Sequence, residues 1–150
     1  MSQQAEQESC GDQCVIDLSQ RRKKAPQEAQ GDGPATLIIL TQGTYGHHDD
    51  GFSAIQVGSA LLAEEERATL LLLEDGVYFA SRDQNPSALG LPNNLRYIQD
   101  FLELGGRILA LQTSLRRRGL SPEDLVPGVE VIPPSRMLKE IEAHHASVTF

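Results

Sequence analysis

Cysteine is scarce in this sequence of 150 residues, which contains only Cys10 and Cys14. The two lie four positions apart in a polar segment, and two thiols are too few for a fold built on disulfides. Their spacing differs from the Cys-x-x-Cys redox motif, and they supply half of a usual structural zinc set. These cysteines therefore matter only if they do chemistry themselves.

Long apolar runs are lacking as well. No run approaches the roughly 20 residues that a membrane span needs. Residues 1–6 do not show the basic region followed by an apolar stretch that marks a secretory signal. We therefore expect a cytoplasmic protein with no membrane partner.

Basic charge is in deficit, because 13 Lys and Arg against 21 Asp and Glu leave a formal net charge of -8. This opposes attraction to phosphate backbones, so we expect no nucleic-acid partner. Gly43-Thr44-Tyr45-Gly46 has neither the spacing of a dinucleotide fingerprint nor the lysine of a P-loop, and no Gly-x-Ser-x-Gly elbow occurs. The sequence therefore does not support a hydrolase, and we expect no cofactor.

The remaining composition, 39% hydrophobic and 23% charged, is that of one globular domain. Residues 1–34 are polar and end in the breaker Gly31-Asp32-Gly33-Pro34. We expect a flexible tail that carries both cysteines, followed by an α/β domain over residues 35–150. Within the tail, Val15-Ile16-Asp17-Leu18 is a short apolar stretch that could dock on the domain or on a neighbouring subunit.

Apolar runs and helical periodicity alternate after residue 34. The continuous run at 35–40 is typical of a strand covered on both faces, as in parallel sheets. The pattern predicts strands at 35–40, 70–73, 107–112, 129–132 and 147–150, and helices at 52–62, 93–104, 114–118 and 133–143. Such alternation implies right-handed crossovers and a sheet with helices on both faces.

Short polar side chains mark the predicted helix starts. Asp49 or Asp50 could cap the first helix, because a carboxylate there accepts free amide protons of the first turn. Asn93 or Asn94 is placed to cap the second helix. Ser121, with a proline next and two acids after it, predicts a further helix start.

Ligands in such a sheet bind outside the carboxyl ends of the strands. That rule selects residues 43–51, 74–77 and 112–116, and the expected pocket residues are Gly43, Tyr45, Gly46, His47, Gly76, Ser114 and Arg116. The loop at 81–92 is long, and long loops in compact domains are often functional.

Clusters of charged and imidazole side chains permit two interpretations. His47-His48, followed by two aspartates, offers metal ligands or only loop polarity; adjacent residues rarely point at one ion, so we expect no metal. Arg116-Arg117-Arg118 offers forked donors to an anion such as a thiolate, or a solvated helix end that complements the dipole, and the second is favoured. His144-His145 is interpreted as positive charge at a helix end.

Four segments together resemble the DsrE/DsrF-like family, particularly the DsrE and TusD branch of bacterial sulfur-relay proteins. They are Gly43-Thr44-Tyr45-Gly46, Ala54-Ile55-Gln56, Glu74-Asp75-Gly76-Val77-Tyr78 and Ser114-Leu115-Arg116-Arg117-Arg118-Gly119-Leu120, and the match covers nearly all of residues 36–150. The resemblance implies a flavodoxin-like three-layer α/β subunit with about five mostly parallel strands. It also implies assembly into trimers, hexamers or hetero-oligomers that pass persulfide sulfur between cysteines of partner proteins.

The resemblance places the family's sulfur-carrying cysteine at the end of the third strand. This sequence has Leu111 there, or Ala110 if an extra arginine shifts the match, and neither supplies the thiolate that a persulfide carrier needs. Leu111 thus joins the expected pocket. The first hypothesis is a relay protein, acting as a sulfurtransferase or sulfur carrier, in which Cys10 and Cys14 replace the missing cysteine. The others are a non-catalytic binding or assembly subunit of a sulfur-metabolism complex and, ranked last, a small-ligand or metal-binding protein.

Overall fold

The computed structural model describes residues 33–45 and 49–150. The predictions made for Cys10, Cys14, Gly46 and His47 concern residues outside these ranges, as does the apolar stretch at 15–18.

Strands and helices alternate along the described chain. The strands are β1 (Ala35–Leu40), β2 (Arg67–Leu72), β3 (Arg107–Leu111), β4 (Val129–Ile132) and β5 (Ala146–Thr149). The α-helices are α1 (Asp50–Ala63), α2 (Leu95–Glu103), α3 (Gln112–Arg117) and α4 (Pro134–Ala143), and η2 (Glu74–Ala80), η3 (Pro86–Leu89) and η4 (Pro122–Asp124) are 3-10 helices. Within the described ranges, no helix has both the length and the hydropathy of a bilayer-spanning segment.

The five strands form one sheet in the order β4-β3-β2-β1-β5, and every ladder between them is parallel. The predicted flavodoxin-like α/β fold is confirmed, with all strands parallel where we expected most of them to be. The central strands β1, β2 and β3 are covered on both faces, and β2 is buried at every position after its first residue. That enclosure explains why their sequences read as continuous apolar runs.

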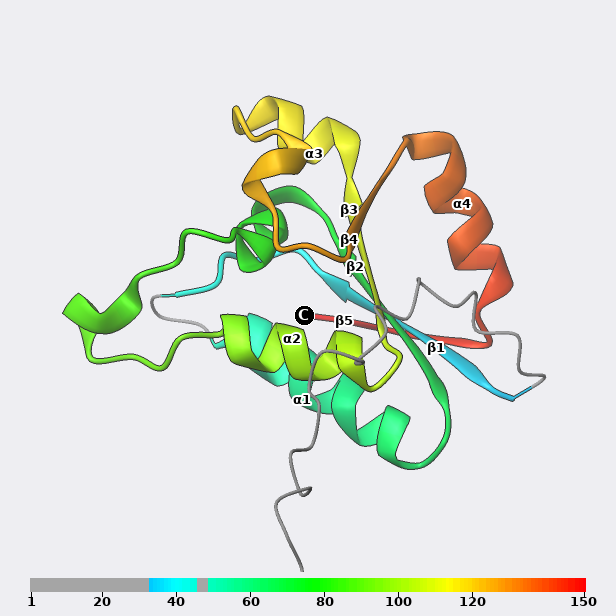
Figure 1. The fold of residues 1–150 in the computed structure, drawn as a ribbon. Helices are drawn as coiled ribbons and strands as arrows, with labels where there is room; N and C mark the ends of the chain where they lie inside the picture. The colour runs from blue at the N-terminus through cyan, green and yellow to red at the C-terminus, as the bar shows by residue number, and fades with distance from the viewer. Residues whose placement is uncertain (1–32, 46–48) are drawn as a thin grey trace, which may run out of the picture.

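Successive side chains of the sheet fill two separate cores, one on each face. Ile38 and Leu70 pack in the core shared with α1 and α2. Leu37 and Leu71 pack in the smaller core, which Met137 of α4 covers. Figure 1 shows α1 and α2 side by side on one face of the sheet and α4 on the other. The molecule is therefore a three-layer sandwich with unequal outer layers.

The predicted cap of the first helix is wrong. Asp49 occupies the cap position of α1, but no side chain makes a cap hydrogen bond, and the Ser53 N–H bonds the Asp49 carbonyl at 2.9 Å. At α2, Asn93 does accept the Leu95 N–H through its side-chain oxygen at 2.9 Å. Asn94, which occupies the cap position, instead turns its amide toward Thr44 Oγ1 at 3.3 Å. Competing tertiary partners thus decide which side chain caps.

Other boundaries shift where tertiary pairing extends or ends an element. β2 begins at Arg67, three residues before the predicted start, because Arg67 pairs with Ala35 at the start of β1. β3 ends at Leu111, since Gln112 already begins α3. The helix start predicted at Ser121 becomes only the three-residue η4, whose Asp124 carboxylate accepts the backbone N–H of Ser121 at 2.8 Å.

Candidate functional site

The carboxyl ends of β1 and β2 meet at a tightly built corner. The Leu73 N–H donates to the Leu40 carbonyl at 2.9 Å, and the Gly76 N–H turns back to the Leu73 carbonyl at 2.8 Å. A Cβ atom on Gly76 would lie 2.1 Å from the Leu40 carbonyl oxygen. Only glycine therefore allows the chain after β2 to pass this close to the end of β1.

Charged side chains lock that corner to α3. Arg118 donates to Asp75 Oδ1 at 2.8 Å, to Glu74 Oε2 at 3.1 Å and to the Ser114 carbonyl at 3.1 Å. The hydroxyl of Ser114 accepts the Glu74 N–H at 3.0 Å. Glu74 adopts a left-handed backbone with φ 47°, which is strained for a residue with a side chain. The corner thus keeps a strained residue in place with contacts from a neighbouring element.

The arginines of the basic run divide between two roles. Partial burial lowers the pKa of Arg118, but hydrogen bonds with Asp75 and Glu74 and their charges outweigh this and raise it above its ordinary value. Its donors are therefore already matched by carboxylates of the same chain. Arg116 and Arg117 lie exposed in the last turn of α3, where positive charge complements the helix dipole.

Leu111 closes β3 directly before α3, at the carboxyl edge beside this corner. Its side chain is 9% exposed, whereas Ala110 is fully buried in the core beneath α1 and α2. Ser114, one turn further on, is also buried, and its hydroxyl accepts the backbone N–H of Glu74. Of the two residues proposed for the family's cysteine position, both are buried, and Leu111 alone keeps a small exposed fraction. An aliphatic side chain there offers no nucleophile.

Tyr45 lies with the long loop after η2. Its hydroxyl donates to Gln84 Oε1 at 2.7 Å and accepts the Asn94 N–H at 3.3 Å. Gln84 in turn donates to the carbonyls of Phe79 and Ser81. These bonds join Tyr45 to the loop at 81–94, and among the described residues no bond is seen between Tyr45 and Leu111, Ser114 or Arg116.

The space around Tyr45 is small. A cavity of about 70 Å³ is lined by Tyr45, Asp49, Phe52, Leu91, Pro92 and Asn94. Gly43, on the same loop, has no atom within 4 Å of the position of a Cβ, so nothing there requires glycine. The described part of this loop therefore serves mainly to fix the loop at 81–94.

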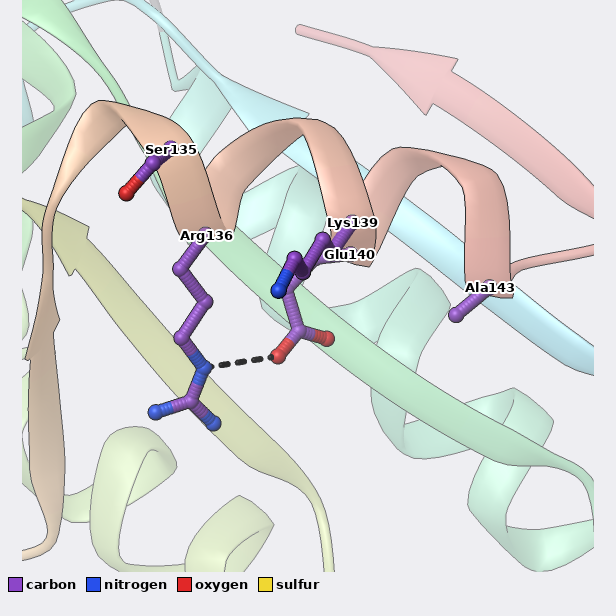
Figure 2. Close-up of a pocket in the computed structure, with 5 residues that line it drawn as sticks. All are labelled: Ser135, Arg136, Lys139, Glu140 and Ala143. Atoms are coloured by element: carbon purple, nitrogen blue, oxygen red, sulfur yellow. Dashed lines mark ion pairs between the residues drawn. The ribbon is translucent and has the colours of Figure 1, made fainter.

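A larger groove of about 400 Å³ runs along α4, lined by Ser135, Arg136, Lys139, Glu140 and Ala143. Figure 2 shows Arg136 reaching toward Glu140, an ion pair of 3.4 Å. The same carboxylate binds the first residue of β3, Arg107, through two bonds of 3.2 and 3.1 Å. This groove lies along the helix and away from the corner formed by Gly76, and its arginine and glutamate are already paired.

Burial by itself raises the pKa of Glu140, but the hydrogen bonds and charge of Arg107, with the charges of Arg136 and His144, hold it below its ordinary value. Glu140 therefore remains ionised and joins β3 to α4.

The histidines after α4 also make hydrogen bonds. His144 Nε2 lies 3.0 Å from Thr69 Oγ1, and His145 Nδ1 accepts the Ala35 N–H at 3.3 Å. Among residues 33–45 and 49–150, no three His, Cys, Asp or Glu side chains gather as metal ligands.

The family of the chain follows from comparison with known proteins. A family model described as DsrE/DsrF-like family matches residues 35–150, which includes every strand and helix of the sandwich. The chain belongs to the DsrE/DsrF-like family. The resemblance read from the sequence is thereby confirmed.

Relatives of this DsrE-like chain include two uncharacterized archaeal proteins. The protein MJ0989 of Methanocaldococcus jannaschii is 31% identical over 113 residues, covering 75% of this chain and 96% of its own. The protein MK0008 of Methanopyrus kandleri is 31% identical over 94 residues, covering 63% of this chain and 75% of its own. They support the family without adding an activity.

Solved structures of similar fold agree with the sandwich. The ychN protein of E. coli superposes with a TM-score of 0.71 at 21% identity, covering 78% of this chain and 99% of its own. The protein of unknown function MTH1491 from Methanobacterium thermoautotrophicum gives 0.59 at 19% identity, covering 79% and 100%. At these identities the likeness concerns the fold of the DsrE-like domain.

Two of the segments selected from the sequence, 74–77 and 112–116, do follow the carboxyl ends of β2 and β3, but their partners were not predicted. The sequence did not predict that Arg118 binds Glu74 and Asp75, nor that Gln84 accepts a hydrogen bond from the Tyr45 hydroxyl. One signal was available: two acids follow β2 and the basic run follows β3. Neighbouring parallel strands bring their carboxyl ends to the same edge, so these opposite charges could have been paired.

Proposed function

We propose that this DsrE-like protein takes part in sulfur trafficking and that Cys10 or Cys14 carries the persulfide that the family carries at the end of β3. The supporting observation is the combination of family membership over residues 35–150 with Leu111 at the end of β3. The two cysteines are the only thiols in the chain. The donor and the acceptor are then cysteine-bearing proteins of sulfur relay or sulfur oxidation in the cytoplasm.

The proposed transfer is a thiol exchange in which atoms and electrons balance. The cysteine thiolate attacks the outer sulfur of a donor persulfide, R–S–SH. The new bond joins the two sulfurs, the donor S–S bond breaks, and the donor leaves as a thiolate. The acceptor thiolate repeats the step on the loaded cysteine. The donor returns to a thiol and the acceptor becomes a persulfide, so no external oxidant is consumed.

A second candidate is a non-catalytic binding or assembly subunit of a sulfur-metabolism complex. The state of the corner supports it, because Arg118 is matched by Glu74 and Asp75, and Ser114 is used by the Glu74 backbone. The arginine of that corner is thus already paired with carboxylates of the same chain. Under this candidate, the family fold is retained for contact with partner proteins while the reaction has been lost.

Mass spectrometry after incubation with a small-molecule persulfide donor separates the two candidates. We expect the full chain to gain the mass of one sulfur on Cys10 or Cys14, and Cys10→Ser and Cys14→Ser to show which one. The double variant Cys10→Ser/Cys14→Ser should gain none. If the parent chain also gains none, the relay proposal is wrong. Recovery of a sulfur-metabolism partner by the double variant would then support the second candidate.

The family position can be tested on its own in the double-serine background. Leu111→Cys restores a thiol at the end of β3, where the native side chain is 9% exposed, and we expect it to react with the donor. Ala110→Cys is the matched control, because the adjacent side chain is fully buried and should stay unreactive. Equal loading of the two variants would contradict the assignment of the carboxyl edge to Leu111.

A further inference from the structure

The groove along α4 takes no part in the carboxyl edge of the sheet. We call it the α4 groove, and it is lined by Ser135, Arg136, Lys139, Glu140 and Ala143. Its volume of about 400 Å³ is large enough to hold several side chains of a bound segment. All of its lining residues except Glu140 are exposed, so they are accessible to such a segment. The charge of the groove therefore decides what it binds.

Two arginines and two carboxylates at the α4 groove balance each other. Arg136 pairs with Glu130 and, at 3.4 Å, with Glu140. Arg107, at the start of β3, lies 3.1 Å from Glu140 and 3.6 Å from Glu130. Lys139 is a further cation, and it makes no hydrogen bond or ion pair with any other described residue. The α4 groove thus has an unmatched positive charge, which favours an anionic occupant.

Lys139 also stands apart in the sequence. It is the only lysine in residues 33–150, where arginine supplies the other permanent positive charges. The whole chain has a net charge of -8, so most of its surface repels acidic groups. The α4 groove attracts them instead.

An acidic segment of the required kind is present in the same chain. Residues 6–14 contain three carboxylates and no lysine or arginine, and we call them the acidic segment. The carboxylates belong to Glu6, Glu8 and Asp12. Both cysteines of the chain lie in the acidic segment, which precedes the described ranges.

The described chain begins next to one end of the α4 groove. The carbonyl of Gly33 accepts a hydrogen bond of 2.9 Å from Arg67, the first residue of β2. The carbonyl of Ala35 accepts the His145 N–H at 2.9 Å, and His145 follows two positions after Ala143, where α4 ends. Figure 1 shows the start of β1 and the end of α4 on the same side of the molecule. The chain before Gly33 therefore departs from the neighbourhood of the groove.

The length of the intervening chain allows the acidic segment to reach the groove. Residues 15–32 separate the segment from Gly33. At about 3.3 Å per residue they span up to about 60 Å when extended. α4 has 10 residues and is about 15 Å long. The acidic segment can thus lie anywhere along the α4 groove of its own chain.

We propose that the acidic segment binds in the α4 groove of its own chain, with Glu8 or Asp12 paired with Lys139. The proposal deepens the relay function proposed above and rests on it for its chemical meaning. Cys10 lies two positions from each of these carboxylates, and nearby negative charge opposes the ionisation of a thiol. Pairing with Lys139 neutralises that charge and brings a cation near Cys10, which favours the thiolate. The α4 groove thereby supplies the positive setting in which a thiol becomes nucleophilic.

Paramagnetic relaxation in the full chain measures the contact. A nitroxide is attached to Cys10 in the Cys14→Ser variant, and the amide signals of the folded domain are recorded by nuclear magnetic resonance. We expect the amides of Ser135, Lys139 and Ala143 to lose intensity. The amides of α1, on the opposite face of the sheet, should keep theirs (Figure 1). Unchanged signals along α4 would overturn the proposal.

Lys139→Glu removes the charge on which the contact depends. It replaces the unmatched cation with an anion, so the α4 signals should recover their intensity. Because Lys139 is exposed and makes no contact of this kind with described residues, the variant should remain folded. Arg117→Glu makes the same change of charge at an exposed residue of α3 and is the matched control, in which the signal loss should persist. Equal signal loss in both variants would contradict pairing with Lys139.

A mixed sample identifies the chain that supplies the acidic segment. Chains with the nitroxide but no isotope label are mixed with isotope-labelled chains that carry no nitroxide, so only contacts between copies weaken the observed signals. We expect the α4 signals to keep their intensity in this sample. Signal loss as strong as in the singly prepared chain would assign the groove to a neighbouring copy and overturn the proposal.

The relaxation measurement needs no persulfide donor, which separates this proposal from the sulfur chemistry. Sulfur loading of Cys10 without signal loss along α4 would overturn the docking and leave the relay proposal standing. Signal loss without sulfur loading would support the docking, and the relay proposal alone would fail. If both hold, Lys139→Glu should load sulfur on Cys10 more slowly than Arg117→Glu does.

Discussion

At the scale of single residues, the carboxyl edge of the sheet depends on positions whose backbone restricts the choice of side chain. Gly76 passes against the backbone of β1, and Glu74 holds a left-handed conformation two positions earlier. Ser114 and Arg118 bind that strained residue from α3. Backbone strain of this kind persists where the surroundings determine it, and it gathers at functional edges. The corner beside Leu111 has this property even though Leu111 itself is inert.

Gly76→Ala should lower the free energy of unfolding by about 2–4 kcal/mol, because its Cβ would meet a backbone oxygen that cannot rotate away. Urea unfolding followed by circular dichroism measures this. Gly43→Ala is the matched control, since nothing lies within 4 Å of its added methyl group, and it should change stability by less than about 0.5 kcal/mol. Equal losses in the two variants would show that the contact with Leu40 is not the cause.

At the scale of elements, α4 is joined to the sheet as much by charge as by apolar contact. Of its residues, Glu140 is buried and Met137 is half-buried, while Leu138 and Ile141 face outward. Glu140 reaches β3 through Arg107. An ion pair this enclosed stabilises little by itself, but breaking it leaves a partly buried arginine without its partner. The attachment of α4 should therefore depend on pH.

Glu140→Gln tests that dependence. The pKa of Glu140 is lowered in the folded chain, so its contribution is present above the unfolded pKa of about 4.3 and is lost as pH falls through the folded pKa. At pH 7 we expect the variant to be less stable by about 1–3 kcal/mol, below the full cost of a broken buried pair because Arg107 is partly exposed. As pH falls through the folded pKa of Glu140, the difference in stability between the parent chain and the variant should shrink.

Chemical unfolding at a series of pH values measures the effect. Glu142→Gln, an exposed carboxylate on the same helix, serves as the control and should cost little at neutral pH. A constant difference between the parent chain and Glu140→Gln down to acid pH would contradict the role given to the Arg107 ion pair.

At the scale of the whole molecule, the burial of the strands declines from the middle of the sheet to its edges. β2 lies between β1 and β3 and is buried almost throughout, whereas β5 is an edge strand with every residue exposed. Local opening is easiest where few buried contacts hold an element. The sheet should therefore open from its edges inward.

Hydrogen exchange should resolve this gradient. We expect the amides of β2 to exchange only through global unfolding, and those of β5 to open with a free energy at least about 1 kcal/mol lower. Mass spectrometry of peptides covering Arg67–Leu72 and Ala146–Thr149 makes the comparison. Equal protection of the two strands would contradict this gradient.

Sequence alone predicted much of the fold because burial is encoded locally. The apolar runs at 35–40 and 107–112 predict enclosed strands, and their alternation with helical periodicity predicts the parallel sandwich. The family resemblance placed Leu111 at the end of the third strand, and β3 does end at Leu111. Hydrophobic periodicity needs no knowledge of distant contacts, so these features could be read from the sequence.

Only the tertiary structure decided which side chains meet. Tyr45 bonds Gln84, and Arg118 bonds Glu74, across about 40 positions of sequence, and either side chain could have faced the expected pocket instead. The same holds for the helix cap, where Asn94 turns to Thr44. The sequence therefore determined the layers and the leucine that ends β3. The contacts of the carboxyl edge follow from how the layers pack, because they join residues that the sequence keeps far apart.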